Sequence, residues 1–296
     1  MSRISTAREE GEMKLEGKIA IVTAAGRGIG KAIALCLAEE GADVVVNSFH
    51  EETTAKVADD IKALGRKALA IPGDITKANM VLQVVEDTIN EFGKVDIVVN
   101  NVGSRPMASK PPDRGPLGRI ETSWDAMYEQ NLKATVLMCE AVAPHLMEKN
   151  SGKIINISSI AARAIVSEKL STYGVASPPY SAMKAGLINY TWFLAERLGP
   201  YNINVNCVCP GIVHTDAWQN SSKRVVENVP EFKGQDPREW FVGIAHGKYP
   251  DMFLPTPMRR EQTSEDIGRA IVFLVSDDSR NITGQALNVD GGMIKS

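Results

Sequence analysis

The sequence lacks the features that would place the protein in a membrane or among disulfide-rich secreted proteins. No apolar run approaches the roughly 18 residues that suggest a membrane span, and residues 1–14 contain no apolar segment of a secretory signal. Only 4 cysteines occur among 296 residues, too few for a disulfide framework. We therefore expect a cytoplasmic protein with no membrane partner, in which residues 1–14 form a flexible tail.

Neither a charge surplus nor a metal-ligand pattern is present. The 33 Lys and Arg residues nearly balance the 36 Asp and Glu residues, for a net charge of −3, so no basic surface for nucleic acid is expected. The 4 histidines are scattered, and Cys207 and Cys209 have no second pair that would complete a zinc site. We expect neither a metal nor a nucleic-acid partner.

What the sequence does contain is a regular alternation of strands and helices. Seven strands are expected, at 18–23, 43–46, 68–71, 95–99, 153–158, 203–208 and 286–289. Helices are expected at 28–40, 53–64, 81–92, 123–149 (capped by Thr122 or Ser123), 180–198 and 267–275 (capped by Ser264). This order predicts an α/β fold with one Rossmann-like, doubly wound parallel sheet and helices on both faces. The length allows two domains, but no shift in composition divides the pattern, so a single domain over residues 15–296 is expected.

A glycine-rich segment with the sequence TAAGRGIG runs from Thr23 to Gly30, between the first strand and the first helix. Glycines in such a turn let the backbone approach a pyrophosphate, and the helix N-terminus stabilises its negative charge. Many turns use glycine only for its positive φ angle. The position directly after the first strand favours nucleotide binding.

Tyr180 and Lys184 lie four residues apart and therefore share one face of a helix. A phenol has a pKa of about 10, too high for acid–base chemistry near neutral pH, and a nearby ammonium group lowers that pKa. Ser159 stands upstream, at the end of a buried strand. Separately, these residues could be an exposed helix pair and a capping serine, but their combination with the glycine-rich turn indicates catalysis.

With these residues in place, the sequence resembles the short-chain dehydrogenase/reductase family over about residues 15–292. The glycine-rich turn is similar to the family's TGxxxGIG motif. The other matching motifs follow in the family's order, and they are Asn100-Asn101-Val102-Gly103 (NNAG in the family), Asn131, Ser159, Tyr180 with Lys184 (YxxxK), Pro210-Gly211 with Thr215, and Asp290-Gly291-Gly292. The short gap within the glycine-rich turn fits the short, non-extended branch of the family.

The resemblance implies a role for each matching residue. Tyr180 would be the general acid or base, and Ser159 would hydrogen-bond the substrate carbonyl oxygen. Lys184 would lower the pKa of Tyr180 and bind the nicotinamide ribose, and Asn131 would support a water chain to Lys184. The implied cofactor-binding residues are Ala24, Arg27, Gly28, Ile29, Gly30, Asn47, Ser48, Asp74, Ile75, Asn101, Gly103, Tyr180, Lys184, Pro210, Gly211 and Thr215.

Two motifs depart from the family pattern by one residue each. Ala24 replaces the first glycine of the turn and adds a methyl group there, which we expect to be tolerated because Gly28 and Gly30 remain. Val102 replaces the usual alanine of the second motif, which we interpret as a variation in packing.

The spacing between the catalytic candidates also departs from the family pattern. Ser159 and Tyr180 are 21 residues apart, more than is usual, so residues 167–177 look like an insertion. Tyr173 is a possible alternative to Tyr180, but residue 177 is a serine and offers no lysine four positions later. We therefore keep Tyr180 as the catalytic tyrosine.

The end of the second strand bears on the choice of cofactor, because an acidic residue there would bind the ribose 2′-hydroxyl of NAD. The strand instead ends in Asn47-Ser48 with no carboxylate. Arg27 occupies a position where basic residues of family members contact a 2′-phosphate, and the guanidinium fork suits phosphate. We favour NADP(H) over NAD(H), with Asp74 and Ile75 flanking the adenine.

Substrate recognition is expected in residues 212–262, which are rich in aromatic residues and proline. These aromatics show neither helix nor strand periodicity, which predicts a mobile lid over the cleft, although a subunit contact or a cover for the core fits equally well. The candidate substrate contacts are Ser104, Tyr173 and Trp218, and an apolar or aromatic ketone is the expected substrate.

The predicted function is an NAD(P)-dependent oxidoreductase that interconverts a ketone or aldehyde and an alcohol, as a 3-oxoacyl reductase or ketone reductase does. The alternative is a catalytically silent dinucleotide-binding sensor, against which the intact catalytic set argues. An extended-branch epimerase or dehydratase fits the glycine-rich turn less well, and an enoyl reductase would need a wider Tyr–Lys spacing. The family resemblance also implies a homo-oligomer, a tetramer or dimer formed through the helices at 123–149 and 180–198.

Overall fold

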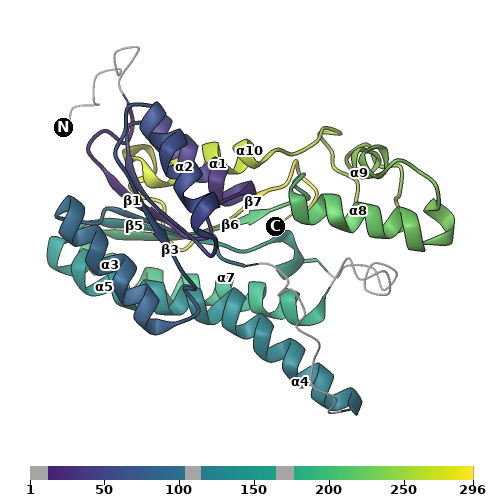
Figure 1. Cartoon of the computed structure of the whole chain (residues 1–296), viewed down its shortest axis with the longest axis horizontal. Helices are drawn as coiled ribbons and strands as arrows, with labels where there is room; N and C mark the ends of the chain where they lie inside the picture. The colour runs from purple at the N-terminus through teal and green to yellow at the C-terminus, as the bar shows by residue number, and fades with distance from the viewer. Residues whose placement is uncertain (1–12, 104–114, 165–176, 296) are drawn as a thin grey trace.

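A seven-stranded parallel sheet forms the centre of the molecule (Figure 1). The computed structural model describes residues 13–103, 115–164 and 177–295. The strands are β1 (Ile19–Val22), β2 (Asp43–Ser48), β3 (Ala68–Pro72), β4 (Ile97–Asn100), β5 (Gly152–Ile157), β6 (Ile203–Pro210) and β7 (Ala286–Val289), in the spatial order β3-β2-β1-β4-β5-β6-β7. The predicted fold class is confirmed.

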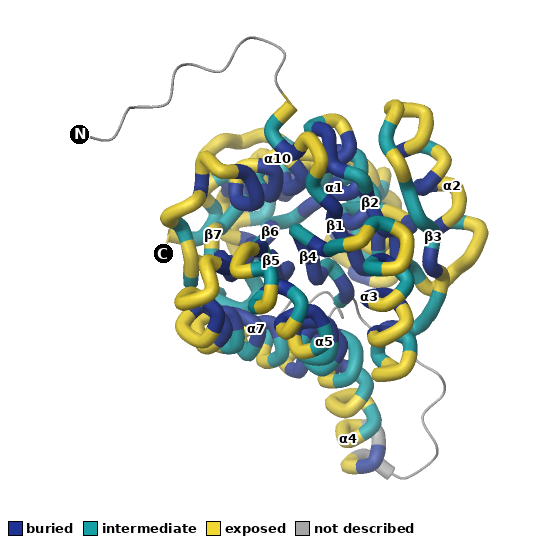
Figure 2. Tube along the Cα trace, turned by 90° about the vertical axis from the view of Figure 1, so that its left-hand side faces the viewer, coloured by how far each residue is buried: buried dark blue, intermediate teal, exposed yellow. Residues whose placement is uncertain are grey.

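Helices cover both faces of the sheet. On one face lie α1 (Gly28–Glu39), α2 (Glu51–Ala63) and α10 (Ser264–Val275), and on the other α3 (Ala78–Phe92), α5 (Ala134–Lys149) and α7 (Pro178–Leu198) (Figure 1). Successive strand residues point to opposite cores: Val22 packs with α1 and α10, whereas Ile21 packs with α3 and α5. Burial on both faces explains the continuous apolar strands, which Figure 2 shows in the centre of the molecule. Among the described residues, no helix is both long and apolar enough to cross a membrane.

The strand order reverses between β1 and β4, which lie next to each other. In doubly wound sheets, ligands bind at the carboxyl ends of the strands where this reversal occurs. Two predicted motifs leave the sheet at that point, because the glycine-rich turn follows β1 and residues 101–103 follow β4. The topology therefore brings both motifs together at this edge of the sheet, the position that we call the crevice because ligands bind there in doubly wound folds.

The long helix expected at 123–149 starts earlier and is interrupted. Helix α4 (Gly115–Tyr128) begins it, and a π-helical turn (Glu129–Lys133) separates α4 from α5. The predicted cap at Thr122 or Ser123 is therefore wrong, since both residues lie inside α4. The predicted cap of the last helix is also wrong by one residue, because the cap of α10 is Thr263 and not Ser264.

Residues 212–262, which are predicted to form a lid and which we call the lid, contain two helices, α8 (Asp216–Asn228) and α9 (Pro237–Ala245). The expectation of no helical periodicity there is wrong. The lid has a core of its own, made of Val225, Val226, Val229, Phe232, Trp240, Phe241, Ile244, Met252 and Phe253. One sequence signal was available: Asp236 caps α9 by accepting the backbone N–H groups of Arg238 and Glu239, both at 2.9 Å, and Pro237 follows it.

Candidate active site

The glycine-rich turn joins β1 to α1 at the crevice. Ala24 and Gly28 have φ angles of +50° and +54°, a conformation that costs a residue with a Cβ about 1–2 kcal/mol. Gly30 has no room for a side chain, because a Cβ there would collide with Ala24 O and lie 2.5 Å from Asn101 Nδ2. Asn101 Nδ2 holds the turn by donating to Thr23 O at 3.3 Å and Ala24 O at 3.2 Å. The N-terminus of α1 is thereby fixed at the crevice, where it can bind a pyrophosphate.

Two hydroxyl side chains, those of Ser48 and Thr53, lie beside this turn near the end of β2. A Cβ on Gly26 would lie 2.6 Å from Ser48 Oγ and 2.7 Å from Thr53 Oγ1. Arg27 is exposed and directly precedes α1, and the Thr53 hydroxyl donates to His50 O at 3.1 Å. Hydroxyl and guanidinium groups are suitable ligands for a phosphate. Arg27 and Ser48 were predicted from the sequence, whereas Thr53 was not, because its position next to Gly26 depends on how α2 packs.

The loop after β6 borders the other side of the turn. Gly211 packs closely, since a Cβ there would lie 2.8 Å from Asp290 Cβ and 2.7 Å from Gln262 Oε1. Thr215 stands at the N-terminus of α8, and a Cβ on Gly28 would lie 3.6 Å from Thr215 Cγ2. The two predicted cofactor segments therefore meet at Gly28 and Thr215. Gln262 is a further residue of this region that the sequence analysis did not identify.

Three of the four predicted catalytic residues, Asn131, Tyr180 and Lys184, come together from separate elements. Tyr180 and Lys184 share one face of α7, and Lys184 Nζ is 5.7 Å from the centre of the Tyr180 ring. Gly103, which follows β4 and has a φ angle of +148°, lies against both Lys184 and Asn131. A Cβ on Gly103 would collide with Lys184 Nζ and lie 2.8 Å from Asn131 Oδ1. Asn131 reaches this point from the π-helical turn, a distortion that is frequent at functional sites.

Lys184 is buried, and its ammonium group is electrostatically perturbed. Its side chain is only 2% exposed, and Nζ donates to Ile157 O at 2.8 Å. Burial away from water disfavours the charged form and lowers the pKa of Lys184 from 10.5 to about 8. At neutral pH, below this pKa, the group still carries its charge. A lysine buried at such a cost is typical of functional sites.

The two serines at the end of β5 have different surroundings. Ser158 is buried, and its Oγ donates to Lys184 O at 2.7 Å, which ties α7 to the sheet. Ser159 is half-buried and caps a 3₁₀ turn (Ile160–Ala162), with its Oγ accepting the backbone N–H of Ala161 at 3.2 Å. This difference favours Ser159 as the serine that faces a substrate.

Some of the predicted cofactor residues also have structural contacts. The buried amide of Asn47 donates to Ile71 O at 2.9 Å, so its side chain joins β2 to β3 and is committed there. Asp74 Oδ1 accepts the backbone N–H and hydroxyl of Thr76 at 3.0 and 2.8 Å, which shapes the turn after β3. Ile29 and Ile75 pack against the two cores.

The predicted substrate contacts are only partly described by the structure. Trp218 lies on α8 and packs against Phe241 and Phe253, with ring centroids 5.7 and 6.4 Å apart. It therefore belongs to the aromatic cluster of the lid. Ser104, Tyr173 and all of the expected insertion at 167–177 except its last residue lie outside the described residues.

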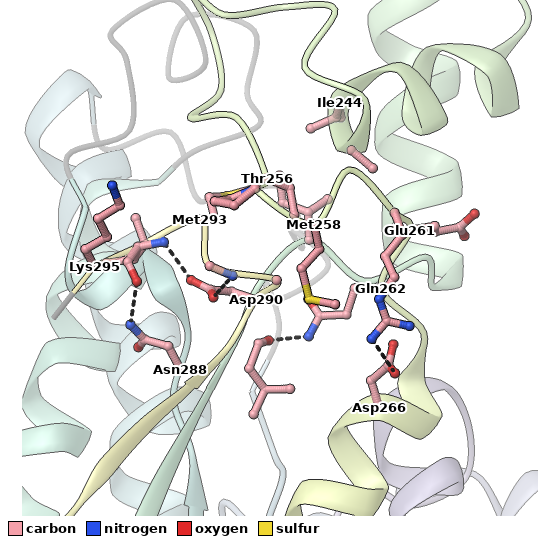
Figure 3. A pocket seen from close by; sticks show the side chains of 18 of the residues that line it. Ile244, Thr256, Met258, Glu261, Gln262, Asp266, Asn288, Asp290, Met293 and Lys295 are labelled. Carbon is pink, nitrogen blue, oxygen red and sulfur yellow. Dashed lines mark hydrogen bonds and ion pairs between the residues drawn. The ribbon is translucent and has the colours of Figure 1, made fainter.

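A hollow of about 880 Å³ lies between α9, residues 256–262 and the C-terminal residues 286–295 (Figure 3). Asp290 shapes its wall by accepting the backbone N–H groups of Gly292 and Ile294, both at 2.8 Å. Gln262 closes another side by donating to Val289 O. The predicted catalytic residues do not line this hollow, so the crevice at β1 and β4 remains the candidate active site.

Two known protein families together match most of the chain. The family described as short chain dehydrogenase matches residues 18–225, a range that includes all four predicted catalytic residues. A second description, Enoyl-(Acyl carrier protein) reductase, matches residues 249–294, which contain the end of the lid, α10 and β7.

Individual relatives align over almost their whole length. The 3-oxoacyl-(acyl-carrier-protein) reductase FabG of Chlamydia muridarum is 34% identical, over 94% of this chain and 98% of its own. A solved 7α-hydroxysteroid dehydrogenase, complexed with NADH and 7-oxo glycochenodeoxycholic acid, has a TM-score of 0.76 at 31% identity, over 98% of this chain and 99% of its own. L-Sorbose reductase from Gluconobacter frateurii, complexed with NADPH and L-sorbose, has a TM-score of 0.80 at 27% identity, over 96% and 99%.

Proposed function

Because the chain belongs to the short-chain dehydrogenase/reductase family and is an NAD(P)-dependent oxidoreductase that interconverts carbonyl compounds and alcohols, we propose that Tyr180 is its general acid and base and that it prefers NADP(H). The observation that carries the proposed role of Tyr180 is the convergence of Gly103, Asn131, Tyr180 and Lys184 at the crevice.

Each catalytic side chain has a separate task in this proposal. Tyr180 gives its phenolic proton to the substrate oxygen in reduction and takes it back in oxidation. Lys184 lowers the pKa of that phenol through its charge and binds the nicotinamide ribose. Ser159 holds the carbonyl oxygen by a hydrogen bond, and Asn131 supports a water chain to Lys184. The nicotinamide cofactor, when bound, supplies or accepts the hydride.

The preference for NADP(H) rests on the groups around Gly26. The Ser48 and Thr53 hydroxyls and the Arg27 guanidinium would surround a ribose 2′-phosphate at the end of β2, and arginine suits phosphate by its geometry. Relatives use both cofactors, since the sorbose reductase structure contains NADPH and the steroid dehydrogenase structure contains NADH.

The proposed substrate is an apolar or aromatic ketone, or a 3-oxoacyl group. The aromatic lid offers apolar surface near the loop after β6 through the partly buried Trp218, which packs on the buried Phe241, and the relative FabG is named for reduction of 3-oxoacyl groups. In this arrangement residues 15–296 act as one domain with 212–262 as the substrate lid, and Ser104 and Tyr173 are further proposed contacts.

A ketone panel with NADPH and NADH tests the enzymatic proposal. Tyr180→Phe should reduce turnover by at least 10²-fold, the lower range for loss of a general acid. Tyr190→Phe is the matched control, because Tyr190 lies on the same helix and its hydroxyl instead donates to Glu140 at 3.0 Å. Full activity of Tyr180→Phe would refute the mechanism, and cofactor binding without turnover of any carbonyl or alcohol would favour the silent sensor.

Fluorescence titration with each reduced cofactor tests the proposed phosphate contact. Arg27→Ala should weaken NADPH binding more than NADH binding, because only NADPH carries the 2′-phosphate. Lys31→Ala is the control, since this lysine lies on α1 one turn later and pairs with Asp60 at 2.7 Å. An equal loss for both cofactors would rule out the contact.

We also propose that the protein is a homo-oligomer. The outer sides of α4 and α7 expose Trp124, Tyr128, Trp192 and Phe193, and clusters of exposed aromatic residues are typical of protein interfaces. These four residues lie in the two segments, 123–149 and 180–198, through which the family resemblance implies assembly.

A further inference from the structure

A series of buried polar side chains crosses the core beneath the candidate active site. Asn100 Nδ2 donates to Asn156 Oδ1 at 2.9 Å, and Asn156 Nδ2 donates to Thr191 Oγ1 at 3.0 Å. The Thr191 hydroxyl in turn donates to Leu187 O at 2.8 Å. The three side chains, which we call the Asn–Asn–Thr network, belong to residues that are 0% exposed. Asn100 Nδ2 also lies 3.2 Å from Cys139 Sγ.

The members of this network stand on the elements that supply the candidate active site. Asn100 ends β4, which leads to Gly103, and Asn156 lies on β5, which leads to Ser159. Thr191 lies on α7, the helix of Tyr180 and Lys184. Cys139 lies on α5, directly after the turn that contains Asn131. The network therefore joins three elements, and the contact of Asn100 with Cys139 adds a fourth; these elements must keep a fixed relation for catalysis.

Helix α7 is held at two separate points. The first is at Lys184, whose carbonyl accepts from Ser158 and whose Nζ donates to Ile157 O. The second is at Thr191, seven residues later, which is about 10 Å along a helix at 1.5 Å per residue. A helix that is held at one point can still turn or tilt about that point, whereas a helix that is held at two points can do neither.

Apolar packing alone would not set this position as tightly. Leu187, Leu194 and Leu198 bury the same helix against the sheet, but hydrophobic contacts are non-directional and tolerate small shifts. Hydrogen bonds require defined distances and angles, and in this network the Asn156 amide is paired through both its oxygen and its nitrogen, while the Thr191 hydroxyl both accepts and donates. The network therefore supplies directionality that the surrounding leucines do not.

We infer that Asn156 and Thr191 are positioning residues, which hold α7 in register with β4 and β5 and so set the placement of Tyr180 and Lys184 relative to Ser159 and Gly103. This inference rests on the proposed function, because it concerns the geometry of those groups. Misplacement by about 1 Å can reduce catalysis by roughly 10²-fold, so a small movement of α7 is sufficient for a measurable effect.

Replacement of Thr191 separates positioning from stability. Thr191→Val keeps the volume but removes the hydroxyl, whereas Thr191→Ser keeps the hydroxyl. Thr88→Val is the matched control: Thr88 is also 0% exposed and donates to the carbonyl four residues earlier, Val84 O at 2.5 Å, but it lies on α3. The measurements are kcat and KM for a ketone that the wild-type enzyme reduces, the pH profile of alcohol oxidation, and Tm.

We expect kcat to fall at least tenfold in Thr191→Val, within the roughly 10²-fold effect of a misplacement of about 1 Å, and to recover in Thr191→Ser. The acidic limb of alcohol oxidation should move to higher pH in Thr191→Val, because an ammonium group farther from Tyr180 lowers the phenol pKa less. Thr88→Val should keep both kcat and the pH profile, whatever its Tm.

A lower Tm in Thr191→Val with unchanged kcat and pH profile would overturn the inference and leave a purely structural role. A loss of kcat that Thr191→Ser does not restore would also overturn it. Failure of the proposed function is a distinct result, since it would appear in the wild-type enzyme and in Tyr180→Phe before any Thr191 variant is compared.

Discussion

At the scale of single residues, the buried Lys184 of the candidate site lowers the stability of the fold. The ordinary pKa of 10.5 falls to about 8 in the folded protein because burial disfavours the charge, and one pKa unit corresponds to about 1.4 kcal/mol. Between pH 8 and 10.5 the unfolded chain binds more protons at this residue than the folded chain does. This group therefore makes stability rise with pH across that window, and its charged form opposes folding at neutral pH.

Lys184→Met should accordingly raise the free energy of unfolding at pH 7 by about 1–3 kcal/mol, the upper value set by the pKa shift. It should also abolish activity and flatten the stability rise between pH 8 and 10.5. Denaturant unfolding at a series of pH values measures the free energy of unfolding and its rise with pH, and turnover measures the activity. Lys153→Met is the control: this lysine has a pKa lowered mainly by burial but lies on β5 away from Tyr180, so activity should persist. A Lys184→Met protein that is less stable at pH 7 would contradict the argument.

At the scale of elements, the lid forms a unit with its own core. Trp240 is 0% exposed and packs against Phe232, Tyr249 and Phe253 with ring centroids 5.8, 5.8 and 6.0 Å away. Because these contacts lie within the lid, their loss should loosen the lid without unfolding the sheet. Local opening of such units is seen as faster amide hydrogen exchange.

Trp240→Ala should lower the local stability of the lid by about 3–5 kcal/mol, the usual cost of removing a buried aromatic residue. Hydrogen exchange should become faster in residues 216–245 but not in β1 or β4, and KM for the substrate should rise. Leu254→Ala is the control, because this residue lies in the lid and is half exposed. Faster exchange throughout the sheet would show that the lid and the sheet unfold together.

The lid also shows where the sequence was informative and where it was not. The strands were predictable because burial on both faces leaves long apolar runs such as that of β1, and α7 because Leu187, Leu194 and Leu198 repeat at helical spacing. On α8 the buried residues Ser222, Val225 and Val226 also repeat at helical spacing, so this helix was predictable as well and was missed.

The candidate site was predictable as far as its chemistry lies in motifs. Arg27, Tyr180 and Lys184 could be found by residue type and spacing, whereas Thr53 could not, because it reaches Gly26 only through the packing of α2. The π-helical turn at Asn131 was missed for a similar reason. Its sequence reads as ordinary helix, and only tertiary contacts decide that an extra residue is accommodated there.

At the scale of the whole molecule, the outer face of α4 and α7 carries the prediction of assembly. Figure 2 shows α4 extending away from the body of the protein, and Leu117, Trp124 and Tyr128 on it are exposed. Helix α4 contacts α7, where Trp192 and Phe193 are 52% and 63% exposed. Such apolar area in contact with water favours burial against another surface, and a second copy with the same helices would supply a self-complementary one.

The double variant Trp192→Glu/Phe193→Glu should therefore dissociate the oligomer, because two buried charges without partners are strongly unfavourable at an interface. Light scattering after size exclusion should give a mass that is a multiple of 32.1 kDa for the wild-type protein and close to 32.1 kDa for the variant. Leu64→Glu is the control, since Leu64 is also exposed but follows α2 on the opposite face of the sheet. A wild-type protein of 32.1 kDa, or a variant that keeps the full oligomeric mass, would show that α4 and α7 do not form the interface, and their exposed aromatic residues would then need another explanation.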